Sequence, residues 1–328
     1  MITISLCFLF SGCTPLAEVT IQVMEPAQIT LPPYIKNVSF INRSYLPSLM
    51  EPDTGTWTVE ELHILDTIIN YRTFEGIAEA LNQSPLFDLG SISVLQGRRT
   101  DTTNFLSPLN HYQLEMVAKK QDPDALVSLE HYKLEGFREL GYTEVDYTAI
   151  LRFYSETCWR IYDMAEDTII DEHMLHDTLI WEEFGESHKT AFNKLPIVTD
   201  ALREAGHHAG FTYGLRISPS WSNELRYYHI GKRKEMKNAA QEALAEEWDE
   251  SAEIWRKLAY RKNKRMASLA SFNMALVCEM KDLIDAALEW AAKSYLIKKH
   301  KFTKEYIELL EMRKADQDKL NVQLPSRE

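Results

Sequence analysis

Trp159-Arg-Ile-Tyr-Asp163-Met-Ala-Glu-Asp167-Thr-Ile-Ile-Asp171 is the stretch of sequence that decides the fold. It lies within residues 142–181, which are rich in Tyr, Ile, Thr and Trp, and the turn-like segment from Asp163 to Asp167 divides this region in two. β-branched and aromatic residues favour extended strands, and short polar segments favour turns. The pattern therefore predicts an antiparallel hairpin that is added to a sheet.

Strands and helices alternate around this hairpin. The run Ile35-Lys-Asn-Val-Ser-Phe-Ile41 predicts a strand. Residues 58–82 have apolar side chains at a period near 3.6 and begin with the capping box Thr58-x-x-Glu61, which predicts a long helix. The other predicted elements are strands at 86–95, from 124 onward and at 211–217, and helices at 111–120 and 186–206. This order is typical of an α/β domain with mixed strand pairing.

The chain changes character at Lys232, after which alanine-rich helices follow and strand signals are missing. At an offset of 35 residues, small side chains coincide: Ala240 with Ala275, Ala252 with Ala287, and Ala259 with Ser294. Small residues let antiparallel helices approach each other, so the offset predicts repeated helix pairs. Residues 303–320 would supply a closing helix. A plain helical bundle is the alternative.

The closing region resembles the tetratricopeptide repeats, most clearly in Asn273-Met-Ala-Leu and Ala286-Ala-Leu-Glu-Trp-Ala291. The resemblance implies a helical interaction module that binds a protein or peptide. In peptide-binding members of that class, a Lys and Asn residues grip a carboxylate. The corresponding partner-binding candidates here are Lys237, Gln241, Asn273 and Lys304.

The first thirteen residues, Met1-Ile-Thr-Ile-Ser-Leu-Cys-Phe-Leu-Phe-Ser-Gly-Cys13, resemble a lipoprotein signal. A short apolar run precedes the small residues Ser11 and Gly12, as a signal peptidase requires. Cys13 is then the residue predicted to be acylated. This predicts a lipid-anchored protein of the cell envelope, at the outer membrane and facing the periplasm. The alternative is an apolar chain end with an ordinary thiol.

The chain as a whole resembles an uncharacterised Bacteroidetes-type family of envelope lipoproteins. The stretches that carry this resemblance are Ile35–Ser44, Asp124–Glu130, Trp159–Asp163 and Arg216–Pro219, together with Cys13 and the helical repeats. The first domain is also similar to the α/β domains of curli-secretion and TolB-type envelope lipoproteins. Both resemblances imply an accessory or assembly protein.

The predicted fold class is α+β. It comprises a signal at 1–13, a mixed α/β sandwich-like domain at 14–220, and an all-α tetratricopeptide-like array at 221–328. A length of 328 residues suits two domains. The net charge of −13 repels phosphate backbones, so nucleic acid is not expected as a partner.

Histidines and cysteines give few candidates for chemistry. His173 and His176, with carboxylates nearby, are weak metal candidates that His207 and His208 would have to complete, because two histidines make only half a zinc site. No metal and no cofactor is predicted. Cys158 and Cys278 are expected to be buried free thiols, with a disulfide as the alternative.

The aromatic residues near position 220 allow two interpretations. Trp221 and Tyr227 are expected to join the two domains, or to line a groove for a ligand such as a glycan. The leading functional hypothesis is a non-catalytic, lipid-anchored scaffold that binds an envelope protein or peptide through its helical repeats. The alternatives are a metal-dependent envelope hydrolase and a glycan-binding module.

Overall fold

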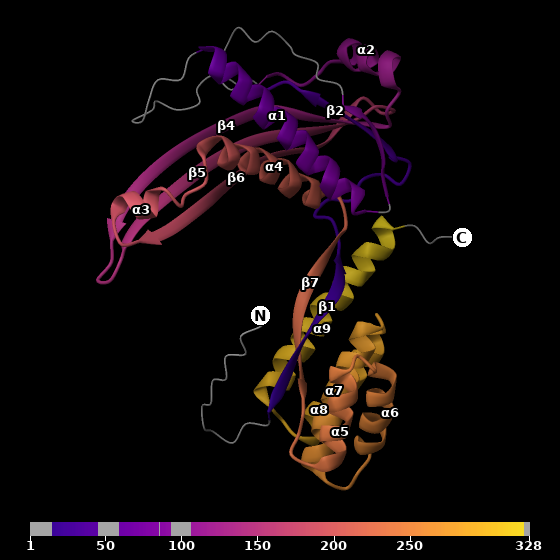
Figure 1. Ribbon diagram of the computed structural model, residues 1–328. Helices are drawn as coiled ribbons and strands as arrows, with labels where there is room; N and C mark the ends of the chain where they lie inside the picture. The colour runs from indigo at the N-terminus through magenta and orange to yellow at the C-terminus, as the bar shows by residue number, and fades with distance from the viewer. Residues whose placement is uncertain (1–14, 45–58, 85, 93–105, 325–328) are drawn as a thin grey trace. The chain divides into compact units, whose positions relative to one another are not determined.

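The computed structural model describes residues 15–44, 59–84, 86–92 and 106–324. The chain divides into two compact units. The first, called the α/β unit, comprises Pro26–Ser220 and Val322–Glu328. The second, called the helical unit, comprises Met1–Glu25 and Trp221–Asn321. The fold class is therefore mixed α+β, with a sheet-containing unit and a helical region towards the C-terminus (Figure 1).

A five-stranded sheet in the order β3-β2-β4-β5-β6 forms the framework of the α/β unit. Its strands are β2 (Asn37–Asn42), β3 (Asp88–Ile92), β4 (Ala125–Tyr142), β5 (Tyr147–Asp163) and β6 (Thr168–Gly185). β2 pairs in parallel with β3 and β4, whereas β4, β5 and β6 are antiparallel. The strands predicted from Ile35, from Asp124 and across the β5–β6 hairpin are confirmed.

The turn between β5 and β6 is formed by the polar segment that the sequence analysis identified. The carboxylate of Asp163 accepts hydrogen bonds from the amides of Ala165 and Glu166, which closes the turn locally. Asp167 has a positive φ of 51°, which Asp tolerates better than most residues. Local side-chain chemistry therefore sets the register of this hairpin.

Two long helices, α1 (Val59–Asn82) and α4 (Val198–Ile217), pack on one face of the sheet (Figure 1). Trp159 is fully buried there, and its ring stacks on that of Tyr213 with centroids 4.7 Å apart. α2 (His111–Gln121) covers the opposite face, where it packs on Leu126 and Tyr162. The helix predicted at 111–120 is confirmed, and α1 agrees with the helix predicted at 58–82, although Thr58 lies outside the described residues.

Two predictions near the end of the α/β unit are wrong. The segment 211–217, predicted as a strand, is the last part of α4. The helix predicted at 186–206 is two helices, α3 (His188–Phe192) and α4, separated by residues that include Pro196. Proline lacks the amide donor that a continuous helix would need. The strand predicted at 86–95 is the shorter β3, and residues 93–95 lie outside the described part.

The helical unit contains α5 (Lys234–Leu244), α6 (Trp248–Leu258), α7 (Lys264–Met280), α8 (Ile284–Ile297) and α9 (Lys301–Gln323). Glu246 and Asp282 have φ values of 65° and 57° and occupy equivalent turns, between α5 and α6 and between α7 and α8. The small residues that coincide at the 35-residue offset are buried, except Ala252, which is half-buried. Two similar helical hairpins are thus followed by α9.

A two-stranded sheet accompanies these helices. β1 (Leu16–Glu25) pairs with β7 (Ser220–His229), and the amide of Ile230 donates to the carbonyl of Pro15 at 3.0 Å. The structure therefore differs from the predicted domains in two respects. Residues 16–25 belong to the helical unit, and the region after 221 begins with a strand. Among the described helices, none has the length and apolar character needed to cross a membrane.

Candidate functional site

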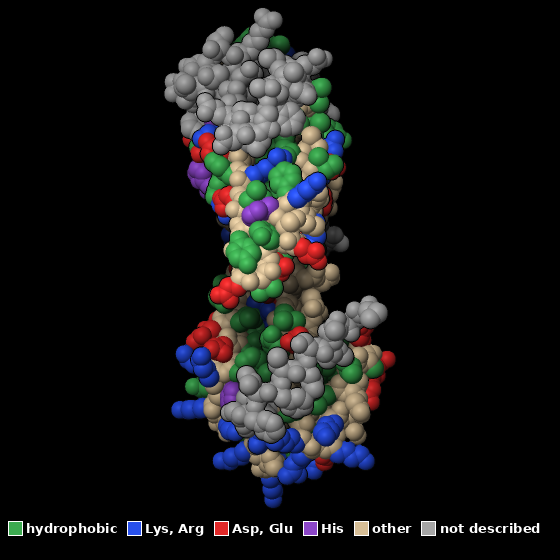
Figure 2. Space-filling view, turned by 60° about the vertical axis from the view of Figure 1, so that its left-hand side comes forward, with side chains coloured by type: hydrophobic (Ala, Val, Ile, Leu, Met, Phe, Trp, Pro, Cys, Tyr) green, Lys and Arg blue, Asp and Glu red, His purple; other side chains and the backbone are tan. Residues whose placement is uncertain are grey.

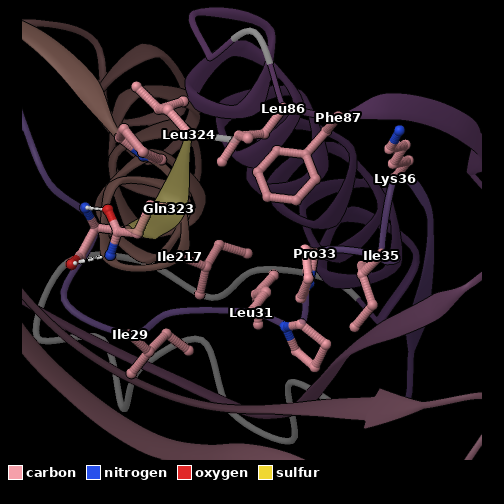
Figure 3. A pocket seen from close by; sticks show the side chains of 13 residues that line it. Ile29, Leu31, Pro33, Ile35, Lys36, Leu86, Phe87, Ile217, Gln323 and Leu324 are labelled. Carbon is pink, nitrogen blue, oxygen red and sulfur yellow. Dashed lines mark hydrogen bonds between the residues drawn. The ribbon is translucent and has the colours of Figure 1, made fainter. Parts of the chain in front are cut away.

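A pocket of about 610 Å³, lined by apolar side chains and by polar atoms, lies in the α/β unit (Figure 3). The irregular segment before β2 contributes one wall through Ala27, Ile29, Leu31 and Ile35. The other walls come from parts of the chain that are distant in sequence: Leu86 and Phe87, Ile217 and Pro219, and Gln323 and Leu324. The volume lies in the range of ordinary ligand pockets, which are about 300–1,000 Å³.

The sequence explains why the segment 26–36 is neither a helix nor a strand. Pro26, Pro32 and Pro33 exclude it from a helix and from the interior of a sheet. The carbonyl of Arg216 accepts hydrogen bonds from the amides of Gln28 and Ile29, at 2.8 and 3.2 Å. The segment bends at residues 28–29 and turns at residues 33–34, where the Ile35 amide donates to the Pro32 carbonyl at 3.0 Å. This path brings Ala27, Ile29, Leu31, Pro32, Pro33 and Ile35 to the pocket.

Gln323 closes one side of the pocket. Its amide oxygen accepts from the amide of Ala27 at 2.9 Å, and its amide nitrogen donates to the Ala27 carbonyl at 3.0 Å (Figure 3). The same nitrogen also donates to the Thr30 hydroxyl at 3.1 Å. The polar atoms of this side chain are therefore used within the wall. The surface left for a bound group combines apolar side chains with other polar atoms.

Lys36 is the charged residue among the described lining residues. Its backbone amide donates to the carboxylate of Asp124 at 2.9 Å, which fixes the chain where the segment enters β2. The Lys36 side chain is exposed and separate from the apolar side chains (Figure 3). The arrangement suits an apolar group that carries an acidic substituent. It offers a place to bind rather than an obvious nucleophile or proton donor.

The sequence analysis missed this pocket. A weak signal was present, because the apolar residues at 27, 29 and 31 alternate with polar residues. The three prolines obscured that alternation as an irregular linker. The remaining walls carry no local signal, since they are brought together only by the tertiary fold.

The predicted carboxylate clamp is not assembled as expected. Asn273 is fully buried, and its amide both accepts from the His229 amide and donates to the His229 carbonyl, each at 2.8 Å. Its side chain therefore holds β7 instead of facing a ligand. Lys237 and Gln241 are exposed on α5, and Lys304 is exposed on α9, where it pairs with Glu308 at 2.9 Å.

The aromatic candidates Trp221 and Tyr227 both lie on β7 but do not form one platform. They are six positions apart along the strand, which corresponds to about 20 Å. The Trp221 side chain is exposed, whereas Tyr227 packs at an angle of 67° against Phe302 with centroids 6.1 Å apart. A sugar ring cannot stack on both.

The histidine candidates do not converge on a metal site. His173 and His176 lie on β6, three residues apart, so they point to opposite faces of the sheet. Burial and the neighbouring Arg216 lower the pKa of His173, and His176 lies 3.5 Å from the Glu156 carboxylate. His207 and His208 on α4 pair with Glu79 and Asp177 instead. Across the described ranges, no cluster of three metal-ligating side chains occurs.

The structure tests the predictions for Cys158 and Cys278 but not the prediction for Cys13. Cys13 lies outside the described residues, so its acylation stays a prediction. Cys158 and Cys278 are buried free thiols, one in each unit, as expected. Burial raises the pKa of Cys158 to about 11, which keeps this thiol protonated and poorly reactive.

Because the His229 side chain is buried, we expect the free energy of unfolding of the helical unit to depend on pH. Burial lowers its pKa to about 4, and the positive charge of His300 contributes to that shift. The unfolded chain binds a proton near pH 6.5, whereas the folded chain does so only near 4, so stability is lost as the pH falls through this window. From pH 7 to pH 5 the expected loss is about 2 kcal/mol.

Urea denaturation at both pH values would measure this loss. The variant His229→Phe, which keeps an aromatic ring beside Phe272 and Phe302, is the control. Its unfolding free energy should depend less on pH by the same amount. Equal pH dependence in both proteins would show that another group is responsible.

Comparison with known proteins gives a family but no activity. A family model described as "Domain of unknown function (DUF8603)" matches residues 35–229, and another, "Domain of unknown function (DUF6340)", matches residues 237–312. The curated proteins include no match to this sequence.

Several solved structures match this chain at low similarity. A putative neuraminyllactose-binding hemagglutinin homolog from Helicobacter pylori is 9% identical, with 59% of this chain and 92% of that chain covered and a TM-score of 0.30. The PelC dodecamer from Paraburkholderia phytofirmans is 12% identical, covering 61% and 99%, with a TM-score of 0.20. Lipoprotein GNA1162 from Neisseria meningitidis is 11% identical, covering 52% and 94%, with a TM-score of 0.19.

Similarity at this level carries no information on function. The match of the first family model is different in kind, since it spans more than half of the chain and includes every strand of the five-stranded sheet. This chain therefore belongs to the family described as domain of unknown function DUF8603.

Proposed function

We propose that this chain is a non-catalytic protein of the cell envelope that is anchored by lipid at Cys13 and binds a protein or peptide partner. The pocket of the α/β unit carries this proposal. Its walls are aliphatic and aromatic, and the amide of Gln323 is used within the wall. The apolar part of this surface would contribute free energy by removing another apolar surface from water.

The partner segment that fits the pocket has an apolar side chain and an acidic group beside it. Burying one Leu or Phe side chain contributes about 1.5–3 kcal/mol, which suits a specific but reversible contact. The exposed ammonium of Lys36 would attract a carboxylate and so orient the segment. A peptide with a hydrophobic residue close to its C-terminus or to an Asp or Glu has both features.

Filling the pocket tests the proposal. Ile29→Trp is expected to weaken binding of the anionic fluorophore 8-anilinonaphthalene-1-sulfonate at least tenfold, which is about 1.4 kcal/mol, because the indole occupies the cavity. The same variant should lose the partner that the wild-type chain recovers from envelope extract. Fluorescence titration and pull-down measure the two effects.

Ile180→Trp is the matched control, since Ile180 is exposed on β6 and does not line the pocket. It should keep both the fluorophore and the partner. If Ile29→Trp folds with an unchanged circular dichroism spectrum and still recovers the partner, the pocket does not bind it.

A second candidate places the partner on the helical unit. The repeated hairpins α5–α6 and α7–α8 favour it, because stacked helical pairs commonly present extended binding surfaces. Lys237, Gln241 and Lys304 are exposed there and remain available to an acidic peptide. In this case Lys237→Glu combined with Lys304→Glu would abolish recovery of the partner, whereas Ile29→Trp would leave it unchanged.

The anchor is tested separately from the binding surface. Intact-mass spectrometry of the protein extracted from membranes should show acyl chains on a new N-terminal Cys13, and Cys13→Ser should release the protein into the soluble fraction. An unprocessed chain that starts at Met1 would exclude the anchor. Fractionation of the two membranes tests the proposed position at the outer membrane, facing the periplasm.

A further inference from the structure

One end of the helical unit is strongly basic. Three clusters that are distant in sequence meet there, and all of their side chains are exposed: Lys232, Arg233 and Lys234; Arg261, Lys262, Lys264 and Arg265; and Lys298, Lys299, His300 and Lys301. In Figure 2, Lys and Arg side chains crowd the end of this unit that is lowest in the view. These ten Lys and Arg residues form a positively charged surface although the net charge of the whole chain is −13.

Contacts within the unit show that the clusters share one end. The ring of His229, just before the first cluster, lies 6.1 Å from the ring of Phe302, just after the third. Ser294, near the end of α8, donates to the carbonyl of Ser268, near the start of α7, at 2.8 Å. The second and third clusters are therefore neighbours as well.

The opposite end has the reverse character. The turns between α5 and α6 and between α7 and α8 carry exposed acidic residues: Glu246, Glu247, Asp249, Glu250, Asp282 and Asp285. Lys281 and Lys314 lie at this end too, but they pair with Asp249 and Asp285. At the basic end, Lys301 pairs with Glu305 at 3.2 Å, and most of the positive charge faces solvent.

The start of β1 lies at the basic end. The hydrogen bond between the Ile230 amide and the Pro15 carbonyl places Pro15 beside Ile230, which lies just after β7 and two positions before Lys232. Only Thr14 lies between Cys13 and Pro15, and two residue steps span at most about 7 Å. A lipid on Cys13 would therefore be attached beside the basic clusters.

We propose that this basic end rests on anionic phosphodiester headgroups of the membrane that holds the anchor. Its position beside Cys13 rests on the proposed function, whereas the attraction between the clusters and the headgroups does not. One acyl chain holds a protein weakly, and a polybasic surface is a common second membrane signal. Each Lys or Arg near an anionic surface adds to the attraction within about one Debye length.

Binding of the full-length, non-acylated Cys13→Ser chain to vesicles tests the proposal without the anchor. The chain is expected to sediment with vesicles of 70% phosphatidylcholine and 30% phosphatidylglycerol, and not with phosphatidylcholine alone. Replacing Lys232, Lys262 and Lys298 by Gln should weaken binding between about tenfold and 100-fold. Raising the salt concentration should also weaken the binding of the parent Cys13→Ser chain to the anionic vesicles.

The matched control removes three charges at the acidic end, by Lys281→Gln, Arg313→Gln and Lys314→Gln. It should bind the anionic vesicles as the parent chain does. An equal loss in both triple variants, or no binding to anionic vesicles, would overturn the proposal. So would binding to polyphosphate or nucleic acid, but not to vesicles, that depends on the same three lysines.

Failure of the proposed lipid anchor and failure of the proposed membrane contact give different results. If mass spectrometry shows no acyl group on Cys13 but the vesicle experiment succeeds, the anchor is wrong and the basic surface stands. If acylation is found and the vesicles are not bound, the anchor stands and the basic surface has another role.

Discussion

Replacing Glu279 by alanine is expected to lower the free energy of unfolding of the helical unit by about 3–5 kcal/mol. Glu279 is buried on α7, and its carboxylate accepts hydrogen bonds from the Arg226 guanidinium at 3.0 and 3.2 Å and from the Tyr306 hydroxyl at 2.6 Å. Arg226 lies on β7 and Tyr306 on α9. One carboxylate thus connects three elements of the unit.

The large effect comes from the group that is left behind. Without Glu279, the guanidinium of Arg226, whose side chain is only 6% exposed, remains in the interior with the half-exposed Glu224 as its other acidic partner. The Tyr306 hydroxyl also loses its acceptor. An uncompensated buried charge costs far more than the net contribution of the pair.

A double variant separates the cost of the unpaired buried charge from the net contribution of the ion pair. Arg226→Met combined with Glu279→Leu removes both charges, and it should recover most of the stability that Glu279→Ala loses. Asp285→Ala breaks an exposed ion pair with Lys314 on the same unit and should leave the unfolding curve unchanged.

Hydrogen exchange of peptides from α7, together with urea denaturation of the full chain, measures the effect within this unit. If Glu279→Ala unfolds within 1 kcal/mol of the wild-type chain, the network does not hold β7, α7 and α9 together.

Local signals were sufficient for part of the fold. The β5–β6 hairpin was predictable because its turn is built by Asp163 from its own neighbourhood, and the strands around it are rich in β-branched and aromatic residues. The helical region was predictable from its alanines and from small residues at a constant offset. In both cases the decisive interactions occur between residues close in sequence.

The failures have the opposite cause. Residues 211–217 contain Phe, Thr, Tyr and Ile, which favour strands when considered alone, but they are helical because α4 packs against α1. The pocket combines four separate parts of the chain. The prediction of a carboxylate clamp was wrong because the amide of Asn273 is hydrogen-bonded to His229 on β7, a strand that was not predicted. Tertiary contacts decided each of these features.

The spacing of the glycines in α4 is a signal from which a helix at 211–217 could have been predicted in place of the strand. Gly206, Gly210 and Gly214 are four residues apart, which places them on one face of a helix. That face meets α1 so closely that a Cβ added at Gly210 would lie 1.8 Å from the carbonyl oxygen of Thr73. An added Cβ at Gly206 would likewise come within 2.8 Å of the carbonyl oxygen of Ile69.

Gly210→Val is therefore expected to destabilise the α/β unit by about 3 kcal/mol or more. The atom that it would contact belongs to the backbone of α1, so no change of rotamer can relieve the overlap, and the two helices must separate. Separation would disturb the core in which Trp159 stacks on Tyr213, a residue of the same helix. The loss should appear as a lower urea midpoint and faster hydrogen exchange in α1 and α4.

Thr212→Val introduces the same side chain into the same helix, at a half-buried position outside the glycine row. It should change stability by no more than about 0.5 kcal/mol, because helix propensities of Thr and Val are similar and no backbone atom is displaced. The contrast between the two variants isolates the close approach of the helices from the helix preference of valine. Equal stability of Gly210→Val and the wild-type chain would mean that α1 and α4 do not meet along this row of glycines.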